Sequence, residues 1–251
     1  MRETVAVAKR YGYAGVEPRI GSGHKHGIEI ASPAAQLKEA ASAAQDSGIA
    51  ICCIATSCSF ANPETHAENV EQARRAIHLA AQVGSPALRV FGGMIPEGVE
   101  RSQSASLIVD ALGCLAQEAQ DAGVTLCMET HDGWCDPEDI AGIMRQVNHP
   151  AVAANWDIMH PVLTANVSVE DAFETLRPYI RHVHIHDGRR ADGKLVFLPI
   201  GQGSIDHRTA VSVLKGTGYD GFLSGEWIGW EPWDVHLPRE IAALRGLEQQ
   251  S

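Results

Sequence analysis

The amino-acid sequence predicts an α/β protein with a TIM barrel of the (β/α)8 type that lacks its first strand. Short β-rich runs alternate with longer helical patterns along the chain, and this alternation is typical of parallel strands joined by crossover helices. The 251 residues match the roughly 250 of one such barrel, and no Pro-, Gly- or Ser-rich linker divides them. We therefore expect a single domain over residues 1–251.

Seven strands are expected, each a short run rich in apolar or β-branched residues. Helical patterns lie between them, such as residues 64–83, where Val70 and Ala73 share one face, and residues 105–122, which end before a glycine. A doubly wound open sheet is the alternative, but no G-x-G-x-x-G motif follows the first strand. The expected strands are residues 15–17, 49–55, 87–91, 124–129, 152–157, 182–186 and 222–226.

The chain opens on a helical pattern rather than on a strand. Val5, Ala8 and Tyr11 form an apolar stripe within the first residues. A closed eight-stranded barrel would need one more strand before Met1, so either the sequence starts late or the barrel is incomplete. We expect the place of the first strand to be empty, or to be filled by something other than the opening residues.

Composition and charge narrow the classes of function. The formal net charge of -11, with no run of more than two Lys or Arg residues, counts against nucleic acid and anionic membranes as partners. No stretch approaches the ~18 apolar residues of a membrane span, and the opening residues lack the apolar core of a signal peptide. The six cysteines form no C-x-x-C pair, which favours reduced buried thiols over metal binding or a nucleophilic cysteine. A soluble, cytoplasmic protein is expected.

Metal-ligand side chains stand at the carboxyl ends of the last four expected strands: Glu129, Asp157, His184 and Glu226. The steps from Glu129 to Asp157 and from Asp157 to His184 are 28 and 27 residues, close to one strand–helix unit. The carboxyl ends of barrel strands meet at one rim, so the four side chains are expected to converge. Taken singly, each acid is more simply a helix cap, an ion-pair partner or a solvated group. Together they favour one divalent ion, Mn²⁺ first, with Mg²⁺, Co²⁺, Fe²⁺ or Zn²⁺ as alternatives.

The motifs GVEPR, METH, NWDIMH, HIHD, IGQGSID and GYDGFLSGEW resemble those of the sugar phosphate isomerase/epimerase family, whose members have a xylose isomerase-like barrel. This family includes ketose 3-epimerases, hydroxypyruvate isomerases and inosose dehydratases. The resemblance covers the chain from Val5 to about Trp227. It implies that the metal ligands are Glu129, Asp157, His184 and Glu226, and that His160 and Arg190 bind substrate.

Three histidines compete for the place of the metal ligand on the strand at 182–186. His182, His184 and His186 alternate along the strand and point to the same face, so register alone cannot choose among them. The family motif favours His184, and His186 stands where many members carry Lys. We add Glu17, His131 and His186 to the substrate-binding candidates; for Glu17 a structural ion pair is an equal alternative.

The resemblance implies an enzyme that isomerises or epimerises a keto sugar or a related polyol. A divalent cation that chelates the ketone oxygen and the neighbouring hydroxyl would act as a Lewis acid toward an enediolate. Glu129 and Glu226 are the expected catalytic residues: one removes the α-proton, and the other can return a proton from the opposite face. A lyase of the inosose dehydratase type is the alternative; a DNA-repair endonuclease and a non-catalytic binding subunit are less favoured. A small molecule is the expected partner, and a homo-oligomer stays open.

Overall fold

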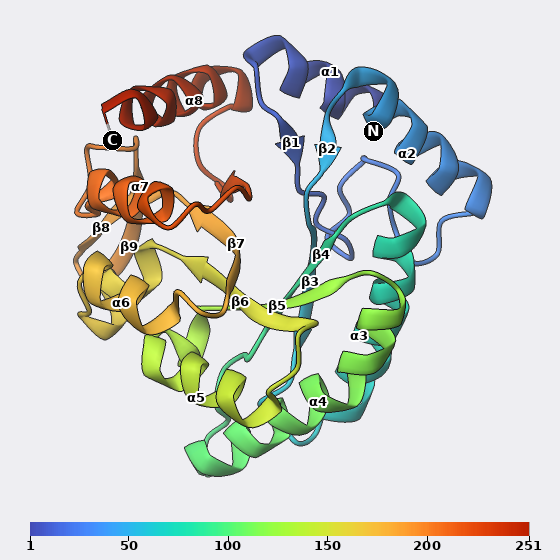
Figure 1. Cartoon of the computed structure of the whole chain (residues 1–251), viewed down its shortest axis with the longest axis vertical. Helices are drawn as coiled ribbons and strands as arrows, with labels where there is room; N and C mark the ends of the chain where they lie inside the picture. The colour runs from blue at the N-terminus through green and yellow to red at the C-terminus, as the bar shows by residue number, and fades with distance from the viewer. Residues whose placement is uncertain (251) are drawn as a thin grey trace.

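The computed structural model describes residues 1–250, and its centre is a curled parallel sheet. Six strands pair side by side in the order β10-β7-β6-β5-β4-β3, and β1 pairs in parallel with β2 next to them. Helices surround the sheet on its outer side (Figure 1). The strands of this barrel are β1 (Gly15–Val16), β2 (Ala50–Ile51), β3 (Ile54–Ser59), β4 (Ala87–Phe91), β5 (Thr125–Glu129), β6 (Val152–Asp157), β7 (Ile180–Ile185) and β10 (Leu223–Gly225).

Eight α-helices cover the sheet within residues 1–250. They are α1 (Arg2–Tyr11), α2 (Ala34–Ser47), α3 (His66–Val83), α4 (Arg101–Asp121), α5 (Pro137–Val147), α6 (Val169–Leu176), α7 (His207–Gly216) and α8 (Trp233–Gln250). Two short helical turns, η1 (Asp132–Trp134) and η2 (Pro161–Ala165), follow β5 and β6. Several helices end at a left-handed glycine; after α3, Gly84 has φ 75° and its N–H bonds to the carbonyl of Ala80.

The main core lies between the sheet and the helices. Leu88 and Val90 of β4 are fully buried in one apolar cluster with Ile77 of α3. On strands, alternate side chains point to opposite faces, so the other face of the sheet carries Arg89, Glu129 and Asp157 toward the barrel interior. Below these polar residues the interior is filled by a small cluster of Cys53, Ala87, Cys127 and Ala153. The barrel is thus packed at its base and polar at the carboxyl ends of its strands.

The predicted partial barrel is confirmed, including the helical start. Val5 and Ala8 of α1 are buried, and the chain reaches its first strand only at Gly15. Within residues 1–250, β1 pairs only with β2, and β10 pairs only with β7. A cavity of about 1120 Å³ lies on this side of the barrel, lined by residues of α1, β1, β10 and α8. Figure 1 shows the ribbons of α8 and α1 on this side of the barrel.

Two segments differ from the sequence-based expectation. The strand expected at 49–55 is divided at Cys52 and Cys53, because its first part pairs with β1 and its second part, β3, pairs with β4 and runs on to Ser59. An unexpected antiparallel hairpin, β8 (Asp187–Ala191) and β9 (Lys194–Leu198), follows β7. Asp192 and Gly193 form its two-residue turn, both with positive φ, as tight hairpins require.

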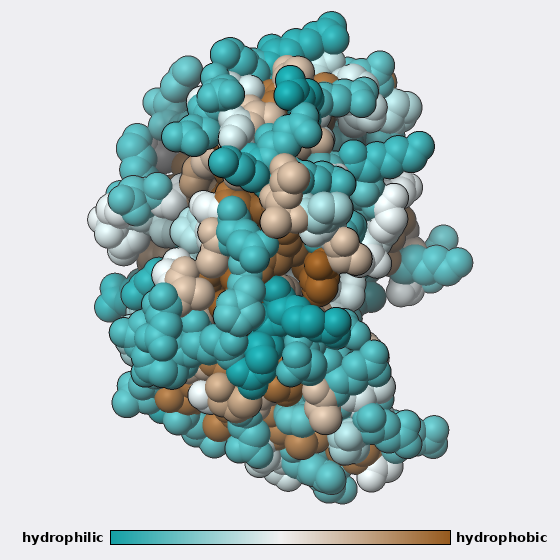
Figure 2. Space-filling model, turned by 90° about the vertical axis from the view of Figure 1, so that its right-hand side faces the viewer, coloured by the Kyte–Doolittle hydropathy of each residue, from teal (hydrophilic) through white to brown (hydrophobic). Residues whose placement is uncertain are grey.

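The surface has the character expected of an outer helical layer. Figure 2 shows the face on the side of α2 and α3, where hydrophilic residues cover most of the area and apolar atoms are confined to small zones between them. No helix within residues 1–250 combines the length and the apolar character needed to cross a membrane. The cysteines of this part of the chain are free thiols, and all but Cys114 are buried.

Candidate metal centre

Four side chains from four neighbouring strands converge at the carboxyl rim. Glu129 and Asp157 are the last residues of β5 and β6, His184 lies in β7, and Glu226 follows β10. The parallel register sets Asp157 beside His184, and His184 beside Ser224 of β10. One ligand atom of each of the four lies within 4.8 Å of the others. Glu129, Asp157 and His184 are buried, and only the side chain of Glu226, 21% exposed, is accessible to solvent.

Two buried carboxylate oxygens in this group have ion-pair contacts, one with Arg89 and one with His186, but no hydrogen bond of good geometry within residues 1–250. They are Oε2 of Glu129 and Oδ2 of Asp157. The other oxygen of Asp157, Oδ1, accepts the backbone N–H of Met159 at 2.8 Å and of His160 at 3.1 Å, which holds the carboxylate in place. Buried anionic oxygens need a compensating positive charge. Three carboxylates and one imidazole therefore fit a divalent cation that prefers oxygen ligands.

Arg89 supplies one positive charge beneath the group. Its guanidinium is fully buried, with Nε 3.1 Å from Oε2 of Glu129 and Nη2 3.5 Å from Oε1 of Glu226. It also stacks over the ring of Phe91 at 4.0 Å. Burial lowers the pKa of Arg89, but the charges of Glu129 and Glu226 outweigh this and raise it. Arg89 is one charge against three carboxylates, so the remaining negative charge is balanced by the neighbouring imidazoles or by a bound cation.

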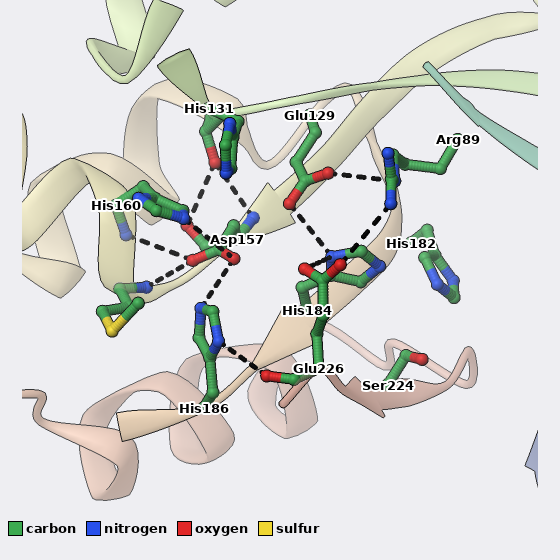
Figure 3. A network of polar contacts seen from close by, with 12 residues as sticks. Arg89, Glu129, His131, Asp157, His160, His182, His184, His186, Ser224 and Glu226 are labelled. Carbon is green, nitrogen blue, oxygen red and sulfur yellow. Dashed lines mark hydrogen bonds and ion pairs between the residues drawn. The ribbon is translucent and has the colours of Figure 1, made fainter. Parts of the chain in front are cut away.

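His184 is held between two sets of carboxylates. Its Nδ1 lies 3.0 Å from Oε1 of Glu129 and 3.3 Å from Oε2 of Glu226, and its Nε2 lies 3.0 Å from Oε1 of Glu17 (Figure 3 draws the Glu129 and Glu226 side). Burial lowers the pKa of His184, but the charges of Glu17 and Glu129 outweigh it and raise the pKa well above its ordinary value. The imidazole is therefore a strong partner for anions and, once deprotonated, a basic ligand.

A second cluster of imidazoles surrounds Asp157 (Figure 3). Nε2 of His186 lies 2.8 Å from Oδ2 of Asp157, while Nδ1 of His186 bonds to the carbonyl of Glu226 at 2.9 Å. His160 lies further away, with Nε2 3.8 Å from the same oxygen, and its ring packs against His131 at 4.3 Å. Burial raises the pKa of Asp157, but the charges of His186 and His160 outweigh it and lower the pKa.

A comparison with known protein families identifies the family of this chain. A family model described as "Xylose isomerase-like TIM barrel" matches residues 5–247, nearly the whole chain. The chain belongs to this family. The resemblance on which the sequence-based expectation rested is thereby confirmed.

Individual xylose isomerase-like relatives are distant. An uncharacterized protein of Methanocaldococcus jannaschii is 29% identical over 167 residues, 62% of this chain and 56% of that protein, so the match spans little more than half of the relative. The 3-dehydroshikimate dehydratase of Bacillus anthracis is 23% identical over 201 residues, 72% of this chain and 70% of the relative.

Solved structures show the same fold as this chain. The apo form of the 3-keto-D-glucoside 4-epimerase YcjR of E. coli is 18% identical with a TM-score of 0.80, over 98% of this chain and 94% of that one. A xylose isomerase-like TIM barrel protein of Mycobacterium smegmatis in complex with magnesium is 19% identical with a TM-score of 0.78, over 99% and 88% of the two chains. The proteins similar to this chain thus include an epimerase and a dehydratase.

In this xylose isomerase-like barrel, two of the predicted substrate-binding side chains, Arg190 and Glu17, are engaged in contacts with other residues of the chain. Arg190 belongs to the β8–β9 hairpin, and its guanidinium donates to the carbonyl of Leu163 at 2.7 Å and to Thr164 Oγ1 at 3.2 Å. Arg190 therefore contacts η2, because the β8–β9 hairpin packs there. Glu17 is bonded to His182 and His184, and it lines the same cavity as Glu226.

Asp187 of the HIHD motif has a role that the sequence did not reveal. Its carboxylate accepts backbone N–H groups of Gly201 and Gly203, each at 2.9 Å, and of Ile205 at 3.3 Å. These bonds fix the glycine-containing turn that leads into α7, and a Cβ on Gly203 would collide with the carboxylate of Asp187. Asp206 caps α7, because its side chain accepts the backbone N–H of Thr209. An acid that follows a strand before a glycine-rich turn was the available signal for Asp187.

Proposed function

We propose that this protein is a divalent-metal-dependent isomerase or epimerase of a keto sugar or a related polyol. Glu129, Asp157, His184 and Glu226 would hold the cation. The observation that carries the proposal is the convergence of three carboxylates and one imidazole, with one ligand atom of each within 4.8 Å of the others. Membership of a family with an epimerase and a dehydratase among the similar proteins supports it.

The two glutamates are the proton-transfer groups of the proposal. A divalent cation, when bound, would act as a Lewis acid toward the substrate carbonyl and make the adjacent C–H more acidic. Glu226 lines the cavity, and although burial raises its pKa, the hydrogen bond from His184 lowers it to about 2, so the carboxylate is ionised at neutral pH. Glu129 approaches His184 from β5, on another side than Glu226 (Figure 3). One glutamate would remove the α-proton and keep it, and the other, once protonated, would donate its own proton to the opposite face of the carbon, which inverts it.

The imidazoles around Asp157 are the proposed substrate-binding groups. His131 and His160 are partly exposed, and His186 stands beside both Asp157 and Glu226. Their ring nitrogens offer donors and acceptors suited to the hydroxyl groups of a sugar. Arg190 would join them only if the β8–β9 hairpin moved toward the site.

A dehydratase is the second candidate, supported by the similarity to the 3-dehydroshikimate dehydratase of Bacillus anthracis. Both reactions begin with removal of a proton next to a carbonyl, so the same glutamates would serve. The two reactions differ in their second step. Epimerisation adds a proton to the opposite face of the same carbon, whereas dehydration expels a β-hydroxyl. Product analysis separates them, because water loss leaves a conjugated enone with ultraviolet absorbance.

We propose Mn²⁺ as the native ion, with a small-molecule sugar or polyol as the partner in the cytoplasm. The first experiment measures metal content by elemental analysis of purified protein. About one divalent ion per chain is expected, and Asp157→Ala or His184→Ala should release it because a chelate site loses affinity with each ligand. His78→Ala, at an exposed histidine on α3, is the control and should keep the ion. Full occupancy in both site variants would exclude this metal centre.

A further inference from the structure

Glu17 is a buried carboxylate shared by two histidines. It directly follows β1, and its side chain is 9% exposed. Its Oε2 lies 2.8 Å from Nε2 of His182, and its Oε1 lies 3.0 Å from Nε2 of His184. Ser224 donates its hydroxyl hydrogen to Oε2 at 2.6 Å. The carboxylate thus joins β1 to β7 and β10, on the side of the barrel where β1 and β10 do not pair within residues 1–250.

The contact with Glu17 determines which nitrogen of His184 is available to a cation. An ionised carboxylate only accepts hydrogen bonds, so Nε2 of His184 must carry a hydrogen in order to bond to Glu17. Nδ1 of the same ring faces Glu129 and Glu226, at 3.0 and 3.3 Å. In the neutral tautomer with hydrogen on Nε2, the lone pair of Nδ1 points to the proposed cation position. Histidine ligands of metals commonly have their other nitrogen fixed by a carboxylate in this way.

We infer that Glu17 is a positioning residue for the metal ligand His184 and does not bind substrate. The inference rests on the proposed metal centre and adds a residue to it. Glu17 holds the Nε2–H tautomer of His184 and fixes the ring between two carboxylate groups. His182 and Ser224 in turn fix Glu17. Both bond to its Oε2, whereas Oε1 is the oxygen that lies closer to His184.

A purely structural role for Glu17 makes different predictions. A clasp between β1, β7 and β10 would affect the free energy of unfolding but not the cation affinity of the folded protein. A positioning residue affects the affinity itself: loss of such a carboxylate typically weakens metal binding roughly 10–100-fold. We expect this loss for Glu17→Ala and for Glu17→Gln. Ser224→Ala removes one contact to Glu17 and none to His184, so a smaller loss is expected.

The test titrates metal-free protein with Mn²⁺ and follows the free ion by electron paramagnetic resonance. Glu118→Gln is the matched control, because Glu118 also faces a histidine, with Oε1 2.7 Å from Nε2 of His78, but on α3 and α4. Circular dichroism establishes that each variant is folded. If folded Glu17→Ala and Glu17→Gln bind Mn²⁺ with wild-type affinity, Glu17 only links β1 to β7 and β10, and the inference is overturned. Binding of a second ion that both variants lose would also overturn it, because Glu17 would then be a ligand.

Nitrogen-15 NMR of the wild-type protein loaded with diamagnetic Zn²⁺ tests the tautomer without any variant. We expect a hydrogen on Nε2 of His184 and coordination through Nδ1. Coordination through Nε2 would overturn the inference even if Glu17→Ala does not fold. The outcomes also separate the two proposals: no cation binding by the wild type removes the metal centre and the role of Glu17 together, whereas unchanged binding in the Glu17 variants removes only the latter.

Discussion

Replacing Arg89 with methionine removes the positive charge that lies between Glu129 and Glu226. The guanidinium and the Glu129 carboxylate are both fully buried, and the nitrogen–oxygen distances to the two glutamates are 3.1 and 3.5 Å. Loss of one partner of a buried ion pair leaves an uncompensated charge and costs about 3–5 kcal/mol. In a domain of this size, 1 kcal/mol shifts the melting temperature by about 2–4 °C, so metal-free Arg89→Met should melt about 6–20 °C below wild type.

The same structure predicts that a cation partly rescues this variant. Its charge would lie beside the carboxylates that Arg89 neutralises, so the deficit of Arg89→Met should be smaller in Mn²⁺ than in EDTA. Thermal unfolding by circular dichroism in both buffers measures the difference. Arg101→Met is the control: Arg101 is half-exposed and paired with Asp139 at 2.7 Å, and its loss should cost at most about 1 kcal/mol in either buffer. Wild-type stability of Arg89→Met in EDTA, or equal deficits with and without Mn²⁺, would refute the reasoning.

Two further predictions concern metal removal and pH. Mn²⁺ at 100 times its Kd should raise the free energy of unfolding by about 2.7 kcal/mol, and EDTA should abolish the gain; identical urea midpoints in the two buffers would speak against a site specific to the folded state. Asp206 accepts the backbone N–H of Thr209 at 3.0 Å, and this bond lowers the pKa of the carboxyl. Asp206→Ala should therefore cost about 1 kcal/mol at pH 7. Because the folded-state pKa is depressed, the contribution is present above the unfolded value of about 3.9 and is lost as pH falls through the folded pKa. Urea unfolding at pH 7 and pH 3 checks this, and an unchanged difference would contradict it.

The central strands could be predicted from the sequence because their signal is local. The structure places β4 and β6 at the expected bounds, 87–91 and 152–157, where short apolar runs are buried in the middle of a parallel sheet. The strand at 49–55 was wrong as one piece, because a change of partner at Cys52 depends on β1 and β4 and not on local composition. The β8–β9 hairpin was missed although Asp192-Gly193 is a strong turn signal and β9 has the apolar sequence KLVFL, because the sequence of β8, DGRRA, contains no β-branched or large apolar residue.

The same division applies to the candidate site. Positions such as Glu129 and Asp157 could be singled out because a strand end locates a side chain at the rim without knowledge of its neighbours. The partners beneath them could not, because they depend on contacts between distant segments: Glu17 meets His184 across 167 residues, and Arg89 meets Glu226 across 137. The register of the strand did not decide which of His182, His184 and His186 is the metal ligand. In the structure, His182 contacts Glu17, His184 belongs to the group of four candidate ligands, and His186 contacts Asp157.

Solvent exchange tests most directly the proposal that Glu129 and Glu226 move a proton next to a carbonyl at this metal centre. With Mn²⁺ and a panel of keto sugars in D₂O, mass spectrometry and NMR should show deuterium at the carbon beside the carbonyl of the accepted substrate. Glu129→Gln and Glu226→Gln keep nearly the same shape and should each lose turnover by a factor on the order of 10² or more. Metal content is measured in the same samples, so that loss of the ion is not mistaken for loss of the base. If a variant keeps its metal and exchanges deuterium but forms no product, the glutamate replaced in that variant is the one that donates a proton to the carbon. Full turnover in both variants with the metal retained would contradict the proposal.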